Sequence, residues 1–169
     1  MRNNSTILEA GAQIVVSVAD ARWSDCAGDV LVTHSLGSCV GVALYDPTVR
    51  IAGLLHFQLP SSAADAQRAR EKPLMYADTG MKLLLGEMER LGCKRKHMRV
   101  KLAGAAEILN NGSLFNIGAR NHTAIRKFLW QNGMFITAED IGGSVPRTVY
   151  LHVDDGTVII KTREQTSEL

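Results

Sequence analysis

The N-terminal third of the chain consists of short apolar runs separated by small polar turns. Residues 12–19 are rich in β-branched side chains, which favour extended backbone, and further apolar runs of strand length occupy residues 30–33, 39–45 and 50–57. Residues 23–29 are polar and predict a turn, and an Asp-Pro turn pair separates the last two apolar runs. Strands this close in sequence favour antiparallel pairing, because parallel neighbours need long crossover connections.

The rest of the chain adds helical periodicity. Apolar side chains recur at helical spacing over residues 74–91, and Gly92 follows as a natural stop. A second helix is predicted over residues 122–132, with Asn121 or Thr123 as its cap. The remaining segments predict a loop or short helix over 61–72, a loop over 110–121, and strands over 99–103, 135–140, 148–153 and 158–161, with a hairpin turn at Asp154-Asp155-Gly156.

Taken together, about seven strands and two clear helices predict an α+β fold, because the order lacks the regular alternation of a parallel α/β sheet. We expect a mainly antiparallel sheet with flanking helices. The length of 169 residues favours a single domain over 1–169, with its core at about 12–162. The polar ends at 1–6 and 163–169 are expected to be loose.

Composition and charge narrow the function classes. The net charge of +2 is too small to favour nucleic acid or an anionic membrane surface as a partner. No apolar run reaches the roughly 18 residues of a membrane span, and the first residues lack a signal-peptide pattern, so we expect a soluble, cytoplasmic protein. The chain has three cysteines, Cys26, Cys39 and Cys93. An odd number argues against a disulfide framework and leaves open one reactive thiol.

Cys39 has the sequence context of a nucleophile. It begins a predicted strand and follows Gly37 and Ser38, small residues that allow a substrate to approach closely. The turn can also leave backbone N–H groups free to bind an oxyanion, and losing one such donor lowers a rate by roughly 10²–10³-fold. A cysteine thiol is mostly protonated at neutral pH, so this chemistry needs a nearby base.

His56 is the candidate base. If the runs 39–45 and 50–57 form a hairpin, residue 39 pairs near residue 56, where side chains are about 4.5–5.5 Å apart. The plain alternative is that Cys39 is an inert buried side chain and His56 a hydrogen-bonded core residue. His34 is a competing base, and a metal site built from His34, Cys39 and His56 fits no zinc-ligand spacing. Cys26 and Cys93 have no predicted histidine partner.

Several segments resemble the CheD family, the chemoreceptor glutamine deamidases of bacterial chemotaxis. The similarity covers residues 12–162 in the family's order. The segments are Thr33…Leu36-Gly37-Ser38-Cys39-Val40, His56…Leu59-Pro60, Tyr76…Asp78, Phe115-Asn116-Ile117-Gly118…Arg120-Asn121 and Ala138-Glu139-Asp140-Ile141-Gly142-Gly143. The chain departs from the family at Ala103-Gly104-Ala105, where two glycines are frequent, and at Ser144-Val145-Pro146, where a more polar stretch is expected.

The resemblance implies a catalytic Cys39, His56 and Thr33. We expect Thr33 to orient the imidazole, and Gly37 and Ser38 to support the oxyanion through the N–H groups of their turn. The resemblance also implies a three-layer α/β/α-like sandwich and hydrolysis of selected receptor glutamine side chains to glutamate. It further implies receptor methyl-ester hydrolysis and binding of a CheC-type phosphatase. We expect no cofactor and no metal. For the glycine, asparagine and aspartate positions of the other segments, a purely architectural role is the alternative to shaping a receptor groove.

Two other functions fit the same residues. One is a thiol hydrolase of a different amide or ester, such as a peptidase, which uses the same three side chains. The other is a non-enzymatic chemotaxis module that regulates a CheC-like phosphatase. An intact Cys39 and His56 pair favours an enzyme over the binding module.

Overall fold

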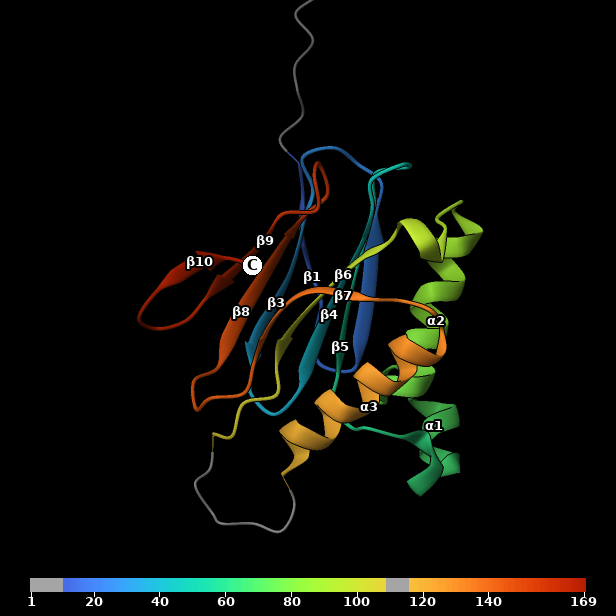
Figure 1. Cartoon of the computed structure of the whole chain (residues 1–169), viewed down its shortest axis with the longest axis vertical. Helices are drawn as coiled ribbons and strands as arrows, with labels where there is room; N and C mark the ends of the chain where they lie inside the picture. Colours follow the sequence, from blue (N-terminus) through green and yellow to red (C-terminus); the bar gives the residue numbers. More distant parts are fainter. Residues whose placement is uncertain (1–10, 109–115) are drawn as a thin grey trace, which may run out of the picture.

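Two five-stranded β-sheets and a group of helices make up the described residues, 11–108 and 116–169, of a computed structural model (Figure 1). We call the first sheet A, and its strand order is β1 (Gln13–Val15), β3 (Val30–Leu36), β8 (Arg147–His152), β9 (Val158–Lys161) and β10 (Thr166–Glu168). Sheet B has the order β2 (Asp20–Ser24), β5 (Ile51–Phe57), β4 (Val40–Asp46), β6 (Arg99–Gly104) and β7 (Ile136–Ile141).

The helices connect strands of sheet B. Between β5 and β6 lie η1 (Ser62–Ala64), α1 (Ala66–Glu71), η2 (Pro73–Met75), α2 (Ala77–Arg90) and η3 (Arg95–His97), and α3 (Ile117–Gln131) follows β6. Most strand pairs are antiparallel, as predicted, but β1 pairs parallel to β3 and β6 parallel to β7. The β6–β7 pair can be parallel because α3 supplies the long crossover that such a pair needs.

Two apolar layers hold three structural layers together. One apolar layer lies between sheets A and B and includes Leu31, Ala43 and Leu54. The other lies between sheet B and the helices α2 and α3. The α+β class and the three-layer sandwich are therefore confirmed. The layers run sheet A, sheet B, helices (Figure 1), so the order differs from an α/β/α-like one.

Strands β4 and β5 form the centre of the molecule. Every residue of both strands is buried, because each face of sheet B is covered by another layer. This explains why their sequences are continuous apolar runs and do not alternate. Any polar side chain on these strands must therefore find its hydrogen-bond partners inside the protein.

The edges of the sheets were the hardest elements to predict. The predicted turn 23–29 overlaps β2, and the C-terminal end expected to be loose contains β10, which pairs with β9. Both are edge strands, and all three residues of β10 are exposed. A strand that pairs through its backbone but buries no side chains has no alternation of apolar and polar residues in its sequence, so β10 could not be predicted. The predicted loose end at 1–6 lies outside the described residues.

The start of α3 also differs from the prediction. The helix begins at Ile117, and the Asn116 side chain accepts a hydrogen bond from the Ala119 N–H as its cap. The predicted cap at Asn121 or Thr123 is therefore wrong, and so is the predicted loop over 116–121. Residues 110–115 of that loop lie outside the described part. Gly118 and Asn121 have low helix propensity, which hid the first turn.

Candidate active site

An irregularity in β3 directly precedes the segment that contains the candidate nucleophile. The pairing of β3 with β8 shifts register between Thr33 and Leu36, and Ser35 adopts a positive φ of 54°. This β-bulge keeps both Thr33 and Leu36 in the buried space between the sheets, although they are three residues apart. Gly41 on β4 faces them, since an ideal Cβ there would lie 3.0 Å from a Leu36 methyl carbon and 3.7 Å from the Thr33 methyl carbon.

Residues 37–39 form the turn between β3 and β4, which we call the nucleophile turn. All three of its carbonyl groups accept hydrogen bonds: Gly37 from the Ala106 N–H at 2.8 Å, Ser38 from Asn121 Nδ2 at 2.9 Å, and Cys39 from the Ala105 N–H at 2.8 Å. Each trans peptide directs its N–H opposite to its carbonyl oxygen. The Ser38 and Cys39 N–H groups therefore point away from the donors that hold their peptides, and neither donates to a backbone carbonyl among the described residues.

His56 and Cys39 project from the same face of sheet B, but they are not directly opposite. His56 pairs with Gly41 because Asp46 and Ile51 are the last pair before the hairpin loop. The predicted direct pairing of residues 39 and 56 is therefore wrong by two residues. An even shift preserves the face, because side chains alternate with a period of two. Cys39 is a diagonal neighbour of His56, at a separation that long side chains can span.

The His56 imidazole is held by one partner in the other sheet. Its Nδ1 lies 2.8 Å from Thr33 Oγ1, and the Thr33 hydroxyl donates to the Val16 carbonyl oxygen at 2.7 Å. A hydroxyl has a single proton, so Thr33 accepts from an Nδ1–H, which puts the imidazole lone pair on Nε2. His56 Nε2 is buried and has no hydrogen-bond partner among the described residues. Thr33 and His56 thus contact each other at the seam between the two sheets, and Cys39 projects from the same face of sheet B as His56.

Burial keeps both candidate catalytic groups neutral. It lowers the pKa of the His56 imidazole to about 4 and raises the pKa of the half-buried Cys39 thiol. A neutral imidazole with a free lone pair can accept a proton, and a neutral thiol can donate one. The shifts of both pKa values therefore favour a neutral thiol and a neutral imidazole in the resting protein.

The other cysteines have different surroundings. Cys93 is buried, and desolvation, with the nearby Asp46 carboxylate, raises the pKa of its thiol to about 11. Cys26 is exposed, and its Sγ lies 3.6 Å from Asp25 Oδ1. Neither cysteine has a histidine hydrogen-bonded to it among the described residues.

His34 does not join the site. It is exposed on β3, next to Thr33, and neighbouring strand residues point to opposite faces. The described residues contain no group of three or more His, Cys, Asp and Glu side chains that could hold a metal ion. No helix among them is long and apolar enough to cross a membrane.

A depression of about 460 Å³ lies beside the nucleophile turn. It is lined by the start of α3 and by the segments after β6 and β7, and Ala105 and Ser144 are among the lining residues. The two places where the sequence departs from the family pattern therefore border the same hollow. Cys39 and His56 do not line it, but Ala105 connects it to the Cys39 carbonyl.

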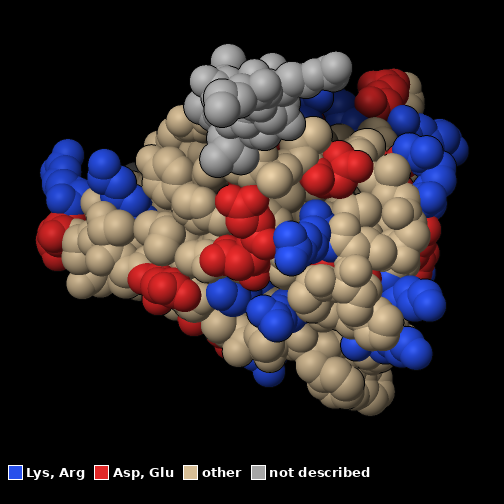
Figure 2. Space-filling view, turned by 90° about the horizontal axis from the view of Figure 1, so that it is seen from above, with Lys and Arg blue, Asp and Glu red and all other residues tan. Residues whose placement is uncertain are grey.

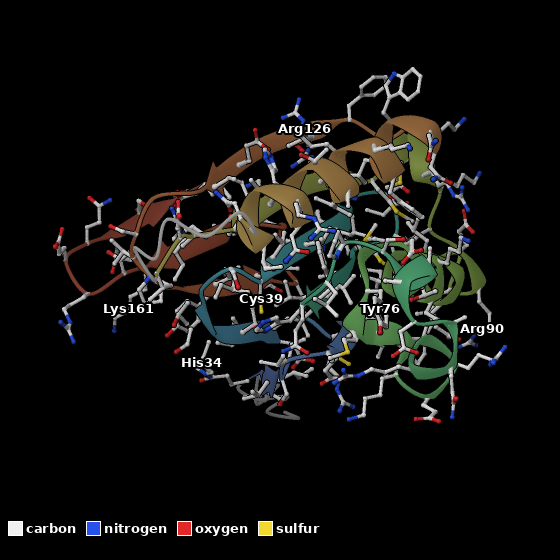
Figure 3. All side chains as sticks on the ribbon, turned by 90° about the horizontal axis from the view of Figure 1, so that it is seen from below. His34, Cys39, Tyr76, Arg90, Arg126 and Lys161 are labelled. Atoms are coloured by element: carbon white, nitrogen blue, oxygen red, sulfur yellow. The ribbon has the colours of Figure 1, made fainter. Side chains whose placement is uncertain are left out.

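Asn121 contacts the nucleophile turn, a role that the sequence did not predict, because the residue was expected to cap α3 and instead lies within it. It is fully buried on α3, and its amide donates to the Ser38 carbonyl at 2.9 Å and to the Gln58 carbonyl at 2.8 Å. Its position in the Arg120-Asn121 segment of the family resemblance was the available signal. In Figure 3, Cys39 lies in the interior of the view near α3, whereas Arg90 and Lys161 lie at the periphery.

Comparison with known proteins decides the family. The model of the family described as CheD chemotactic sensory transduction matches residues 58–162. The chain belongs to the CheD family. The match to the CheD model begins after Cys39 and His56, so it does not itself cover the candidate catalytic residues.

Curated CheD relatives align over most of the chain. A protein of Syntrophus aciditrophicus named probable chemoreceptor glutamine deamidase CheD 1 is 45% identical over 88% of this chain and 93% of its own. Proteins named probable chemoreceptor glutamine deamidase CheD are 40% identical in Solibacter usitatus, over 93% of both chains, and 41% identical in Archaeoglobus fulgidus, over 89% of this chain and 94% of that one. A crystal structure of the hypothetical protein YfiH from Bacillus licheniformis has a TM-score of 0.47 and 16% identity, covering 71% of this chain and 49% of that one.

Proposed function

We propose that this CheD-family protein is a chemoreceptor glutamine deamidase that uses Cys39 as nucleophile, His56 as general base and Thr33 to orient the imidazole. The names of the curated relatives support the substrate class. The observation that carries the catalytic assignment is the Thr33–His56 contact at 2.8 Å, because it leaves the Nε2 lone pair free on the face of sheet B that also holds Cys39.

The first half of the reaction forms a thioester. His56 Nε2 takes the thiol proton, and the Cys39 sulfur attacks the carbonyl carbon of a glutamine side chain. The carbonyl electron pair moves onto oxygen, and the N–H groups of Ser38 and Cys39 stabilise that oxyanion. The intermediate collapses when the imidazolium returns its proton to the departing nitrogen, which leaves as ammonia.

The second half returns the enzyme to its starting state. His56 takes a proton from water, and the resulting hydroxide equivalent attacks the thioester carbon. The tetrahedral intermediate expels the Cys39 sulfur, which recovers its proton from the imidazolium, and the product is a glutamate side chain. Water and the amide supply every atom. The same steps hydrolyse a glutamate methyl ester with methanol as the leaving group, so receptor methyl-ester hydrolysis is part of the proposal.

Mass spectrometry of a chemoreceptor cytoplasmic fragment tests the function. The fragment is incubated with wild-type protein, with Cys39→Ala and with Cys26→Ser, and converted glutamines are located by peptide mapping. We expect specific glutamines to gain about 1 Da, as the replacement of NH₂ by OH requires, with wild type and with Cys26→Ser only. Cleavage of casein by the wild-type protein would favour a peptidase instead.

The binding-module alternative makes the opposite prediction. In that case folded wild-type protein binds the fragment and leaves every glutamine unchanged. A CheC-type phosphatase is a further proposed partner that follows from the family resemblance, and co-purification with a phosphatase of that type from the same cell tests it. Binding that survives in Cys39→Ala would show that the partner does not depend on the thiol.

A further inference from the structure

One buried amide connects the two backbone segments that lie next to the candidate catalytic residues. Asn121 Nδ2 donates to the carbonyl of Ser38, which immediately precedes Cys39, and to the carbonyl of Gln58, which lies two residues after His56. The side chain comes from α3, in the layer on the outer side of sheet B. Both protons of the Nδ2 group are therefore used by backbone next to the site.

The bond to Ser38 sets the direction of another group. The Ser38 carbonyl and the Cys39 N–H belong to one planar trans peptide, so they point in opposite directions. An amide that fixes the carbonyl also fixes the N–H. Because the Cys39 N–H donates to no backbone carbonyl among the described residues, the bond from Asn121 is the contact with another residue that sets the rotation of this peptide.

The surroundings of Asn121 favour this role over simple helix packing. Its Oδ1 is buried and accepts no hydrogen bond among the described residues. An asparagine that served only to fill space is easily replaced by an apolar side chain, which has no unsatisfied oxygen. The presence of an amide with one unsatisfied end indicates that its two donor contacts matter.

We propose that Asn121 is a positioning residue that turns the Cys39 N–H toward the oxyanion formed during attack by Cys39. The inference rests on the proposed role of Cys39 as nucleophile, but not on the identity of the substrate. Asn121 touches neither the substrate nor the reacting atoms, and acts through the Ser38–Cys39 peptide.

Two reactions of the same thiol separate this role from a general structural one. In the first, Cys39 attacks the carbonyl of p-nitrophenyl acetate, forms an acetyl thioester and releases p-nitrophenolate, with an oxyanion in the transition state. In the second, Cys39 displaces iodide from iodoacetamide at a saturated carbon, where no oxyanion forms. Only the first reaction needs the Cys39 N–H in the correct direction.

We expect Asn121→Ala to lower the Cys39 acetylation rate at least about tenfold, and toward 10²–10³-fold if the donor is lost entirely. The rate of Cys39 alkylation by iodoacetamide, and its pH profile, should stay within about twofold of wild type because that reaction builds no negative charge on oxygen. Equal losses in both reactions, or no loss in acetylation, would overturn the proposal. Both rates are measured in a Cys26→Ser background, with Cys39→Ala as the blank.

Asn132→Ala is the matched control. Asn132 also lies on the α3 side, where its Nδ2 donates to the Phe128 carbonyl at 2.7 Å, but at the opposite end of the helix. Its loss should lower the melting temperature and leave acetylation unchanged. If Asn121→Ala does not fold, Asn121→Ser, which keeps one hydroxyl donor, is used for the same comparison. If Asn121→Ala loses acetylation selectively while the wild-type protein deamidates no receptor fragment, the proposed substrate is refuted and the Asn121 inference stands.

Discussion

Thr33 on sheet A and His56 on sheet B meet across the interface of the two sheets, with 2.8 Å between Thr33 Oγ1 and His56 Nδ1. The Thr33 hydroxyl is itself held by the Val16 carbonyl oxygen at 2.7 Å. This chain of contacts fixes which imidazole nitrogen carries the proton. The candidate base therefore depends on how the two sheets pack, as well as on the strand that contains it.

Replacement of Thr33 by valine tests the orientation of the imidazole. Thr33→Val keeps the shape but removes the hydroxyl, so His56 Nδ1 and the Val16 carbonyl lose their partner in a buried space. We expect kcat for deamidation to fall at least about tenfold, because the imidazole is no longer held in one tautomer. The free energy of unfolding should fall by about 1–3 kcal/mol for the unpaired polar groups.

Thr33→Ser is the matched variant, because serine retains the hydroxyl and loses one methyl group. Its kcat should stay within about threefold of wild type if the hydroxyl is what matters. Urea unfolding and steady-state deamidation of the receptor fragment provide the two measurements. If Thr33→Val and Thr33→Ser have the same activity, the hydroxyl does not orient the base.

Stability should depend on pH through His56. Burial lowers the pKa of the folded-state imidazole from 6.5 to about 4, so the unfolded chain binds the proton more tightly. The contribution is fully present above pH 6.5 and is lost as the pH falls through about 4. The wild-type protein should lose about 3 kcal/mol of unfolding free energy more than His56→Gln does over this range.

Urea titrations of both proteins at pH 7 and near pH 4 measure the difference. The comparison with His56→Gln removes the contribution of carboxylates that titrate in the same range. Parallel pH dependence in the two proteins would contradict a neutral, buried imidazole. Because His56 stays neutral down to about pH 4, its protonation should not limit deamidation at pH 6.

The three cysteines should react with iodoacetamide in distinct ways in the native protein. Cys26 is exposed and should be labelled at a rate that does not depend on His56. Cys39 should be labelled more slowly in His56→Ala than in wild type, because the imidazole accepts its proton. Cys93 should stay unlabelled until the protein unfolds, since burial raises the pKa of its thiol to about 11. Peptide mapping over time gives the three labelling rates. An equal Cys39 labelling rate in wild type and His56→Ala would contradict the assignment of His56 as the base.

Gly104 should be essential to the nucleophile turn. Its φ is +112°, and a Cβ there would overlap the Cys39 carbonyl oxygen. Gly104→Ala should therefore displace that carbonyl from the Ala105 N–H and abolish measurable deamidation. Gly92 is the matched position, with a φ of +98° and no atom within 4 Å of an added Cβ.

Gly92→Ala thus measures the effect of backbone strain alone, without the steric overlap that an added Cβ causes at Gly104. We expect it to lower the unfolding free energy by about 1–2 kcal/mol, the usual penalty for an L-residue in left-handed backbone, and to leave kcat unchanged. Gly104→Ala should show a larger stability loss together with the loss of activity. Activity in Gly104→Ala close to that of Gly92→Ala would mean that the turn tolerates the displacement.

Charge gives little guidance to a docking surface. In Figure 2, lysine and arginine side chains lie among aspartate and glutamate side chains over one face of the protein. Several basic groups are paired, as in the contacts of Arg126 with Glu139 and of Arg147 with Asp140. This mixture agrees with the net charge of +2, which did not favour nucleic acid or an anionic membrane surface.

The sequence by itself determined the α+β class, the β4–β5 hairpin and the helix α2. It also singled out Cys39 as the candidate nucleophile and His56 as the candidate base. Apolar runs indicate buried segments, and turn residues indicate where the chain reverses direction. These elements can therefore be predicted from residues that are close together in the sequence. The common face of Cys39 and His56 also followed from the sequence, because the error in register was an even number of residues.

The tertiary structure alone decided the contacts between residues far apart in the chain. The register of the hairpin depends on Asp46, which pairs with Ile51 while its side chain accepts hydrogen bonds from Thr48 and Lys94. Thr33 reaches His56 only because sheet A packs on sheet B, and Asn121 reaches the nucleophile turn only because α3 begins earlier than its local propensity indicates. Such contacts arise from the packing of layers, which no local pattern of residues encodes.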